Sequence, residues 1–548
     1  MATTASAIKI AIIGAGPRGL GAIESLVAKL AERETPLELT TFDDLQLAGA
    51  GPNFDPSQTP HCILNIPLRE VDIPPALPLP CGDFTDWQKQ NGLTDADRFP
   101  PRAELGAYLM ARFRNVTEIK GIQIKLTTHK SKATHLRRHE VAWHVETNTA
   151  SHGPFDEVLL IPGQPQTPPD DQWAAWQAHA GTGKARALNA YPDRQLLAAA
   201  KDWAGKNIGI RGLGLSTFDV LRVLTLGLGG RFENGCYHRS GAEPARIFAF
   251  SLNGQPPFPK PKDAALDALF DLRDQEIEQF QSAVKTATEQ KPKSALETIC
   301  AALVQPTERI GVEMGADWGR AEISAWLETE RKSAGDQETL DPEQTLKQGI
   351  NMALGASPPT PGYVIGQIWR KVQNQLRANF NGLQMEPDTA QAIVGFDEGL
   401  KRYSYGPPLR SAQELLAMLA CNLVSLCVVD DPDIKSIQDG WHLQEDDAEA
   451  KVSVMIDAVL PPPKLAAISD PLLVQLKSDG LIQEFYDGSG AQTRPNGQVV
   501  GTEGTPQTGL CLLGRLALGS VIAADSIHDC FGASSGRWAK GVLERSRK

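Results

Sequence analysis

The sequence has no closely spaced cysteines. Its eight cysteines are dispersed along 548 residues, without a C-x-x-C pair and without the Cys/His spacing of a metal site. Dispersed cysteines are typical of reduced thiols in a cytoplasmic protein. We therefore expect a cytoplasmic chain with no bound metal. The pattern also argues against enzymes that work through a redox-active cysteine pair.

The sequence also lacks an excess of positive charge and a long apolar run. It carries 54 Lys and Arg against 66 Asp and Glu, a formal net charge of −12, which argues against nucleic acid or an anionic membrane as a partner. The longest apolar stretch, residues 415–429, contains Asn422 and Ser425 and is shorter than the roughly 20 residues of a membrane-spanning helix. It predicts a buried helix. Residues 1–7 are small and polar without a basic segment, so no signal peptide is expected.

An apolar strand runs directly into a glycine-rich turn near the start of the chain. Residues 8–13, Ile-Lys-Ile-Ala-Ile-Ile, precede Gly14-x-Gly16-x-x-Gly19, and a helix with apolar residues at helical spacing follows. In that context Gly14 allows the tight turn, Gly16 lets the backbone approach a pyrophosphate, and Gly19 brings the helix close to the strand. The N-terminus of the helix then offers free amides to the phosphates.

The next predicted strand supports the same interpretation. It covers residues 37–42 and ends at Asp43. A carboxylate at this position of a dinucleotide-binding unit accepts the ribose hydroxyls. The order of strand, glycines, helix, strand and acid predicts a Rossmann-type unit for one dinucleotide.

A second copy of the pattern begins at residue 207. Residues 207–211 have the composition of a strand, and a Gly-x-Gly turn and a helix follow. The residues expected to bind the second nucleotide are Gly212, Gly214, Ser216 and Thr217. Thr217 replaces the third glycine, a change common where the nucleotide is a nicotinamide; a purely structural glycine turn is the alternative. With two nucleotide sites, one holds a flavin and the other admits a nicotinamide that delivers hydride to it.

The choice between NADPH and NADH depends on the segment after the second turn. Residues 231–240 offer Arg231, His238 and Arg239 instead of the acid that an NAD site would have. A cation there can hold a 2′-phosphate, so Arg239 favours NADPH, with NADH still possible. An ordinary surface charge is the alternative role for Arg239.

Further stretches of the chain are similar to one protein family. They are residues 49–55, 64–67, 99–109, 240–244, 401–408 and 514–525. In these stretches the chain resembles the bacterial FAD/NAD(P)-binding proteins of the HpyO-like type, distant relatives of the class B flavin monooxygenases and the N-hydroxylating monooxygenases. It departs from the family at Ala242, where an arginine is usual, and at residues 161–162, where Ala-Thr is usual. The resemblance implies FAD and NAD(P)H as cofactors.

The resemblance also suggests residues for the flavin site. Asn65 would place its amide near the reactive part of the flavin; a structural, hydrogen-bonded asparagine is the alternative. Arg102, at the start of an amphipathic helix, would contact the cofactor or else form an ion pair with Glu104. Gly163 ends a buried strand, where the chain would pass close to the dinucleotide. Asp525 would contact the ribityl chain or the pyrophosphate.

The activity implied by the resemblance is that of an NAD(P)H-dependent flavin monooxygenase. NADPH would reduce FAD, O₂ would form a C4a-peroxyflavin, and one oxygen atom would pass to a small molecule. The first guess for the reaction is N-hydroxylation of an amine or amino acid. An FAD-dependent NAD(P)H oxidoreductase or dehydrogenase without oxygen insertion is the alternative, and a cofactor-stabilised binding protein is a third hypothesis. The substrate and the oligomeric state stay open.

The predicted fold is α/β, with two Rossmann-like dinucleotide-binding modules and a large helical insert. At 548 residues the chain exceeds a single hydrophobic core. Residues 1–200 are predicted to form an FAD-binding domain that residues 452–548 complete. Residues 201–262 would be the NAD(P)H-binding module, and residues 263–451 a mainly helical insert on the substrate side.

Overall fold

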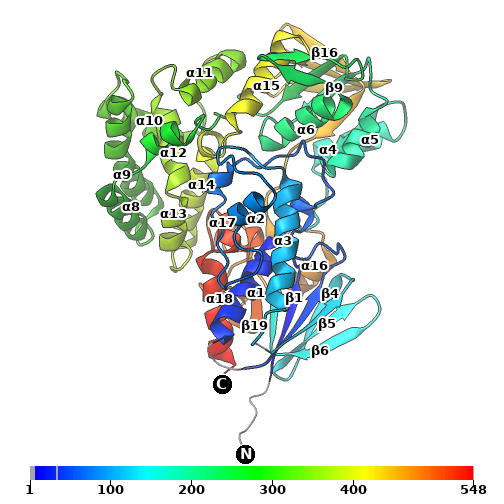
Figure 1. Ribbon diagram of the computed structural model, residues 1–548, viewed down its shortest axis with the longest axis vertical. Helices are drawn as coiled ribbons and strands as arrows, with labels where there is room; N and C mark the ends of the chain where they lie inside the picture. The colour runs from blue at the N-terminus through cyan, green and yellow to red at the C-terminus, as the bar shows by residue number, and fades with distance from the viewer. Residues whose placement is uncertain (1–6, 32–34, 122, 338, 547–548) are drawn as a thin grey trace, which may run out of the picture.

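The molecule contains two parallel sheets and one helical region. The computed structural model describes residues 7–31, 35–121, 123–337 and 339–546. The first sheet lies in the lower half of Figure 1 with both ends of the chain, the second sheet at the upper right and the helical region at the upper left. The predicted α/β fold, with two Rossmann-like modules and a helical insert, is confirmed.

The first sheet is formed by strands from both ends of the chain. Its strands are β1 (Ile8–Ile13), β2 (Leu37–Phe42), β3 (Ile124–His129), β7 (Glu157–Leu160), β18 (Gln498–Val500) and β19 (Pro506–Leu512). The order is β18-β19-β7-β1-β2-β3, and every pair except β18–β19 is parallel. A parallel sheet must be covered on both faces, and β1 and β7 accordingly consist almost entirely of buried residues.

Helices and a small antiparallel sheet cover the first sheet. The helices of this part are α1 (Pro17–Leu30), α2 (Phe84–Gln90), α3 (Arg102–Thr117), α16 (Pro471–Ser478), α17 (Ile527–Cys530) and α18 (Ala533–Arg545). The antiparallel sheet consists of β4 (Ala133–His139), β5 (Ala142–Thr147) and β6 (Ser151–Phe155). Helix α1 packs against both α3 and α18 (Figure 1), so a C-terminal helix completes the layer that begins with the first glycine turn.

The second sheet draws its strands from three separate stretches. They are β8 (Arg186–Asn189), β9 (Asn207–Arg211), β12 (Arg246–Phe250), β13 (Val424–Ser425) and β17 (Val454–Asp457), in the order β13-β12-β9-β17-β8, all parallel. The helices of this part are α4 (Asp171–Ala180), α5 (Asp193–Ala200) and α6 (Leu215–Thr225). The boundaries predicted at 200/201 and 451/452 are therefore wrong, because β8 lies before the first and β17 after the second.

The segment predicted as the strand after the second turn is a separate hairpin. Strands β10 (Arg231–Glu233) and β11 (Cys236–His238) pair only with each other. The turn between them is Asn234-Gly235, and both residues have positive φ, as a two-residue hairpin turn requires. The strand beside β9 is β12 instead. A second excursion, β14 (Asp433–Ile437), β15 (Gly440–Glu445) and β16 (Ala448–Val452), forms its own three-stranded sheet.

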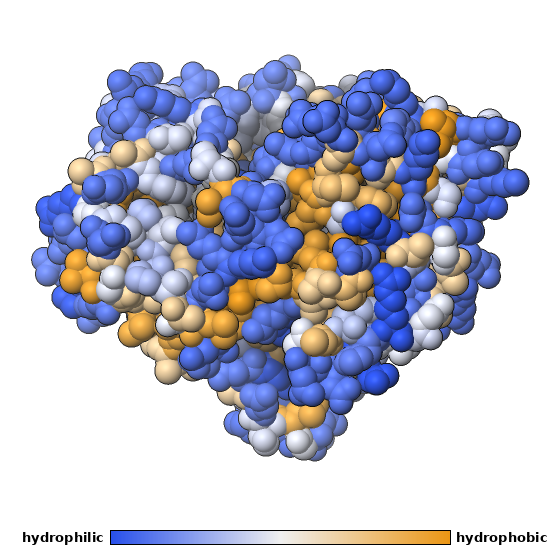
Figure 2. All heavy atoms as spheres, turned by 90° about the horizontal axis from the view of Figure 1, so that it is seen from above, coloured by the Kyte–Doolittle hydropathy of each residue, from blue (hydrophilic) through white to orange (hydrophobic). Residues whose placement is uncertain are grey.

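The helical insert and the second sheet share one hydrophobic core. The helices of the insert are α7 (Ala264–Asp267), α8 (Asp274–Ala287), α9 (Pro292–Glu313), α10 (Arg320–Lys332), α11 (Pro342–Leu354), α12 (Pro361–Lys371), α13 (Gln373–Phe380), α14 (Pro387–Ser404) and α15 (Leu409–Ala420). One buried cluster contains Ile208 and Ile210 of β9 together with Trp369 of α12 and Tyr403 of α14. Seen from above, apolar side chains gather in the middle of the face, between hydrophilic outer regions (Figure 2).

The buried helix predicted for residues 415–429 is wrong in its second half. Helix α15 ends at Ala420, Asn422 takes a positive φ of 56°, and Val424 and Ser425 form β13 beside β12. Both the helical part and the strand part of this apolar run contain buried residues. A short apolar run is compatible with a buried helix and with a buried strand, so its hydrophobicity alone does not distinguish them.

Among the residues that the structure describes, none of the helices combines the length and the apolar character that crossing a membrane requires. In the same residues no group of three or more His, Cys, Asp or Glu side chains is arranged to hold a metal ion.

Candidate functional site

The parallel strands of the first sheet bring three predicted site residues, and a further glycine, to one edge. Strands β1, β2, β7 and β19 all end at this edge, and the residues that follow them are Gly14, Asp43, Gly163 and Gly514. Backbone hydrogen bonds join the ends of these strands, for example from the Gly14 amide to the Phe42 carbonyl at 3.0 Å. In open α/β sheets, ligands bind at the carboxyl ends of the strands.

The three glycines of the first turn differ in what surrounds them. Gly14 has a φ of +93°, and a β-carbon on it would lie 2.1 Å from the Ile161 carbonyl oxygen. A β-carbon on Gly19 would lie 3.0 Å from the Gly14 carbonyl oxygen. Both glycines therefore allow close packing of turn, helix and β7. Gly16 is different, because its β-carbon would meet only the backbone of Gly51, at 3.7 Å or more.

Gly51, in the segment after β2, lies against the first turn. It has a φ of +63°, and its own β-carbon would lie 3.3 Å from the Gly16 α-carbon. Gly49, two residues earlier, donates its amide to the Ala15 carbonyl at 2.6 Å. The glycine pair after β2 thus packs against the first turn. Without side chains at Gly16 and Gly51, the backbone at this point can approach a phosphate closely.

Asp43 lies directly beside the first turn. Its Oδ2 accepts a hydrogen bond from the Ala15 amide at 2.9 Å, and its Oδ1 accepts one from the Leu45 amide at 2.9 Å. Gly163 follows β7 with a φ of +63°, and no atom lies within 4 Å of the position of a β-carbon. The structure therefore brings Gly14, Gly16, Asp43 and Gly163 together around one open edge.

The first turns of α1 and α6 both have the features of a phosphate site. Their N-cap residues are Gly16 and Gly214, neither helix has a side chain that caps its first amides, and neither has an acid in its first turn. Uncapped amides and the positive end of a helix dipole together favour a phosphate. The residues present thus fit a dinucleotide pyrophosphate at each turn.

The second turn divides its four predicted residues into two pairs. Gly212 has a φ of +115° and packs against the Ala458 backbone, while the buried Thr217 hydroxyl donates to the Gly212 carbonyl at 2.7 Å. These two residues shape the turn. Gly214 is exposed with no atom within 4 Å of a β-carbon position, and Ser216 is half-buried. Gly214 and Ser216 are therefore the pair on the accessible side.

Arg239 lies at the wrong edge of the second sheet for the role predicted from the sequence. Its guanidinium donates to the Ala245 carbonyl at 3.3 and 3.4 Å, beside the start of β12. The glycine turn meets the other end of β12, where the Gly212 amide donates to the Phe250 carbonyl at 2.7 Å. A nucleotide binds at the carboxyl ends of the strands, so Arg239 cannot hold its 2′-phosphate. The segment that precedes Arg239 is the hairpin β10–β11, whereas the strand that pairs with β9 is β12.

Arg102 joins the two nucleotide modules. Its Nη2 lies 2.5 Å from Oδ2 of Asp219 on α6, and the Tyr191 hydroxyl donates to the same oxygen at 2.5 Å. The alternative partner considered from the sequence, Glu104, is paired with Arg98 at 2.9 Å. Arg102 is thus held by the second module. Asp219 and Tyr191 carried no motif that could have indicated this contact.

Asp525 is held by two cations at the boundary with the insert. Its carboxylate lies 2.8 Å from the Lys401 Nζ and 3.1 Å from the Arg515 Nε. Although burial alone would raise the pKa of Asp525, Lys401 and Arg515 hold it below its ordinary value. These contacts attach the C-terminal part of the first module to α14. That Asp525 contacts the cofactor stays a prediction. Its carboxylate already has two cationic partners.

Asn65 lies where the first module meets the second. The neighbouring Ile63 carbonyl accepts a hydrogen bond from the Arg102 Nε at 3.4 Å, which places this segment beside the Arg102–Asp219 pair. The Asn65 side chain is half-buried, and within the described ranges no hydrogen bond to it is found. Its amide is thus available to a ligand at the boundary between the modules.

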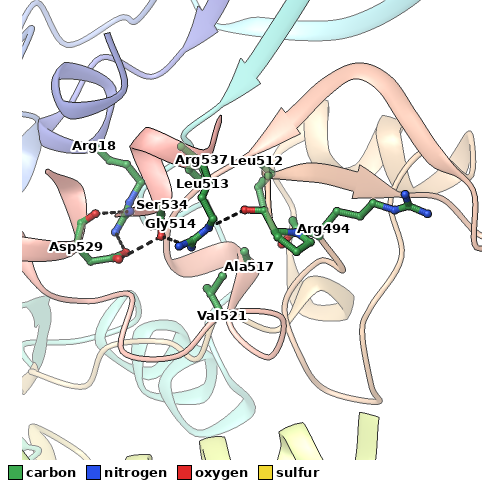
Figure 3. Close-up of a pocket in the computed structure, with 13 residues that line it drawn as sticks. Arg18, Arg494, Leu512, Leu513, Gly514, Ala517, Val521, Asp529, Ser534 and Arg537 are labelled. Atoms are coloured by element: carbon green, nitrogen blue, oxygen red, sulfur yellow. Dashed lines mark hydrogen bonds and ion pairs between the residues drawn. The ribbon is translucent and has the colours of Figure 1, made fainter. Parts of the chain in front are cut away.

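A cavity behind the first turn is too small for a substrate. It lies between Arg18 and Gly514 and has a volume of about 10 Å³, which is the space of one water molecule. Figure 3 shows Arg18 directed at Asp529, and the two form an ion pair at 2.7 Å. A β-carbon on Gly514 would lie 2.9 Å from the Arg18 Nε. This region therefore fastens the C-terminal segment to α1.

Lys260 is a buried cation that the sequence did not indicate. It lies in the proline-rich connection between β12 and the insert, and its Nζ donates to the Gly406 carbonyl at 2.9 Å. Burial and, to a smaller extent, the Arg370 cation lower the pKa of Lys260 to about 7, against the opposing effects of Glu70 and Asp267. At neutral pH this ammonium group is close to losing its proton.

The stability of the protein should therefore rise with pH in a way that depends on Lys260. The unfolded chain keeps this proton up to the ordinary pKa of 10.5, whereas the folded protein releases it near 7. The unfolded state binds more protons between these values, so the free energy of unfolding increases with pH. With about 1.4 kcal/mol per pKa unit, the gain from pH 7 to pH 9 is about 2 kcal/mol. Urea unfolding of the wild type and of Lys260→Met should differ by this gain; parallel pH profiles would contradict it.

The first module is similar to a known protein family. Residues 11–165, which contain the first turn, Asp43, Arg102 and Gly163, match the family model described as FAD-NAD(P)-binding. The match covers 155 of the 548 residues and lies within the first module. The matched segment contains β2, β3, β7 and most of β1, and the remaining strands of the same sheet, β18 and β19, come from the C-terminal part of the chain.

Two known proteins are similar to a longer part of the chain. The nitrosuccinic acid synthase npaA of Aspergillus oryzae is 30% identical over 266 residues, which are 45% of this chain and 40% of that protein. The L-aspartate N-monooxygenase (nitrosuccinate-forming) of Streptomyces cremeus is 23% identical over 579 aligned residues, covering 87% of this chain and 84% of that protein. The chain thus spans less than half of the first relative and most of the second.

A solved structure shares the fold of the whole chain. The ornithine N-hydroxylase of Kutzneria sp. 744, in a structure with reduced FAD, NADP⁺ and L-ornithine, has a TM-score of 0.51 at 12% identity. The likeness covers 98% of this chain and 99% of that one. The arrangement of two nucleotide modules and a helical region is therefore the fold of a known flavoprotein.

Proposed function

We propose that the protein is an NAD(P)H-dependent flavin N-monooxygenase that acts on a small amino acid, with L-aspartate as the first candidate. The observation that carries the proposal is the placement of two phosphate-binding turns on modules that Arg102 and Asp219 hold together. FAD would bind at the first turn and NAD(P)H at the second. The relatives that form nitrosuccinate support the reaction and the substrate.

The chain's own residues would bind and orient the two nucleotides. The amides at the start of α1 would hold the FAD pyrophosphate against Gly16 and Gly51, with Asp43 at its ribose. The amides at the start of α6, with Ser216, would hold the nicotinamide nucleotide. When bound, the flavin would accept the hydride and activate O₂. The Arg102–Asp219 pair would keep the modules in an orientation in which the nicotinamide lies close enough to the flavin for hydride transfer.

A buried arginine at the boundary between insert and first module suits an acidic substrate. Arg377 on α13 is 8% exposed, and its guanidinium donates to the Ala523 carbonyl at 3.3 Å and to the Asn374 Oδ1 at 2.6 Å. No carboxylate within the described ranges pairs with it. A buried cation without a counter-ion is costly, and a substrate carboxylate would relieve that cost. This arrangement favours an amino acid with an additional carboxylate over a basic one.

The test is a comparison of amino acids with the FAD-loaded protein. We expect L-aspartate, and not L-ornithine or L-lysine, to accelerate O₂-dependent oxidation of NADPH and to yield an oxygenated amino acid by mass spectrometry. NADPH oxidation that proceeds with an artificial electron acceptor but gives no oxygenated product with any amino acid would contradict the proposal. That result would support an NAD(P)H oxidoreductase without oxygen insertion.

Asn65→Ala should separate flavin reduction from productive use of oxygen. Hydride transfer depends on the placement of the nicotinamide, so reduction by NADPH should stay near the wild-type rate. Loss of one hydrogen bond near the oxygen-reacting part of the flavin is worth about 1.5–3 kcal/mol, roughly tenfold to a hundredfold in rate. NADPH oxidation should then release H₂O₂ in place of product. Asn53→Ala, an exposed asparagine on the same segment, is the control; full coupling or loss of FAD in the Asn65 variant would make Asn65 structural.

A further inference from the structure

Arg402, near the end of α14, has a buried guanidinium without a polar partner among the residues that the structure describes. All three of its side-chain nitrogens are buried, and none of them has a hydrogen-bond partner in those residues. No acid of the described chain forms an ion pair with it, and its guanidinium carbon lies 5.8 Å from the centre of the Tyr403 ring. The adjacent Lys401 differs, because it is held by Asp525 and Glu398. An unpaired buried cation is rare in folded proteins and calls for an explanation.

The guanidinium lies at the carboxyl end of the strand next to the second turn. A β-carbon on Gly335 would lie 2.8 Å from the Arg402 Nη1 and 3.8 Å from the Asn253 Nδ2, so both groups flank the same glycine. Asn253 is in the turn that follows β12. The Arg402 backbone is anchored there as well, because its carbonyl accepts the Phe258 amide at 3.2 Å.

In a Rossmann unit this is the position that contacts the ribose of the adenosine. The first strand of the unit carries the glycine turn, and the end of the neighbouring strand carries the residue that distinguishes a 2′-hydroxyl from a 2′-phosphate. Here the first strand is β9 and its neighbour is β12. The turn after β12, residues 251–253, offers the Ser251 hydroxyl and the Asn253 amide, which hydrogen-bond each other at 3.4 Å, and no acid.

We propose that Arg402 binds the 2′-phosphate of NADPH, with Ser251 and Asn253 beside it. This inference rests on the proposed function, in which the second turn holds the nicotinamide nucleotide. An arginine forms two parallel charge-assisted hydrogen bonds with a phosphate. An acid from another segment, Asp430 after β13, packs against Gly254 beside this turn and would repel a phosphate in the absence of a cation. The selecting residue thus comes from the helical insert and not from the nucleotide module.

The experiment measures nucleotide binding and does not need turnover. FAD-loaded wild type, Arg402→Gln, Arg402→Lys and Arg239→Gln are titrated with 2′,5′-ADP and with ADP by calorimetry. The wild type should bind 2′,5′-ADP at least about tenfold more tightly than ADP, because two charge-assisted hydrogen bonds are added. Arg402→Gln should lose this preference, Arg402→Lys should keep part of it, and Arg239→Gln should keep all of it.

Each other outcome has a definite meaning. A preference for 2′,5′-ADP that survives in Arg402→Gln, or that disappears in Arg239→Gln, would overturn the role of Arg402. Equal affinity of the wild type for the two nucleotides would also overturn it and leave the proposed monooxygenase intact, as an enzyme that uses NADH. Failure of the wild type to bind either nucleotide would overturn the assignment of the second turn and this inference with it. The flavin absorbance spectrum and the unfolding midpoint of each variant show whether Arg402→Gln has kept its fold.

Discussion

Gly16→Val should give a protein that is purified without its yellow colour. A β-carbon on Gly16 would lie 3.7 Å from the Gly51 α-carbon, an ordinary contact, but the two branches of a valine would fill the space in which a pyrophosphate approaches α1. Each charge-assisted hydrogen bond that the phosphates then lose is worth about 1.5–3 kcal/mol. Loss of two of them weakens FAD binding roughly a hundredfold or more. The measurement is the ratio of flavin to protein absorbance after gel filtration, with and without added FAD.

The matched control is Gly536→Val on α18. This glycine is also partly exposed, it lies inside a helix, and no atom lies within 4 Å of the position of its β-carbon. The change exchanges one poor helix former for another, so flavin content and unfolding midpoint should stay near the wild type. A Gly16 variant that remains saturated with FAD would contradict the assignment of the first turn as the flavin site.

Gly214→Val should keep the flavin and lose its reduction by NAD(P)H. Gly214 is the exposed N-cap of α6 with extended backbone, and nothing lies within 4 Å of a β-carbon there. A valine therefore fits the fold at the cost of a weaker N-cap, about 1 kcal/mol. It does, however, occupy the space in front of the α6 amides. Flavin content should be unchanged, while the rate of anaerobic flavin reduction at low NADPH concentration should fall by roughly a hundredfold or more.

Gly395→Val, at an exposed position on α14 with open space around it, is the control for this variant. It should leave both flavin content and reduction rate near the wild type. Normal reduction of the Gly214 variant by NADPH would mean that the second turn is structural. The nicotinamide would then have to bind elsewhere, and the assignment of two nucleotide sites would fail.

The sequence was sufficient where neighbouring elements are also neighbours along the chain. Strand β1, the glycine turn, α1, β2 and Asp43 follow one another within 36 residues, and each has a periodicity or a residue type that physical chemistry explains. The same holds for β9, Gly212 and α6. The structure adds that Gly14 and Gly212 shape their turns, while a β-carbon on Gly16 would meet only the Gly51 backbone and one on Gly214 would meet no atom within 4 Å.

The sequence was insufficient where partners come from distant stretches. Arg102 and Asp219 are 117 positions apart, and neither has a pattern that marks the other as its partner. The hairpin β10–β11 has the composition of a strand but lies outside the second sheet, so Arg239 was assigned to the wrong edge. Lys260 and Arg402 lie in or beside connections between modules. Their burial follows from how the modules pack, which no local pattern encodes.

The position of β19 in the first sheet affects how the protein is made. Strand β7 has β1 on one side and β19 on the other, and β19 consists of residues 506–512. During synthesis from the N-terminus, β7 therefore keeps an unpaired edge while almost the whole chain is translated, and such edges promote aggregation. The Arg18–Asp529 and Glu157–Arg545 pairs also form only at the end. Because the first sheet is incomplete without β19, we expect the flavin site to form only after residues 506–512 have been synthesised.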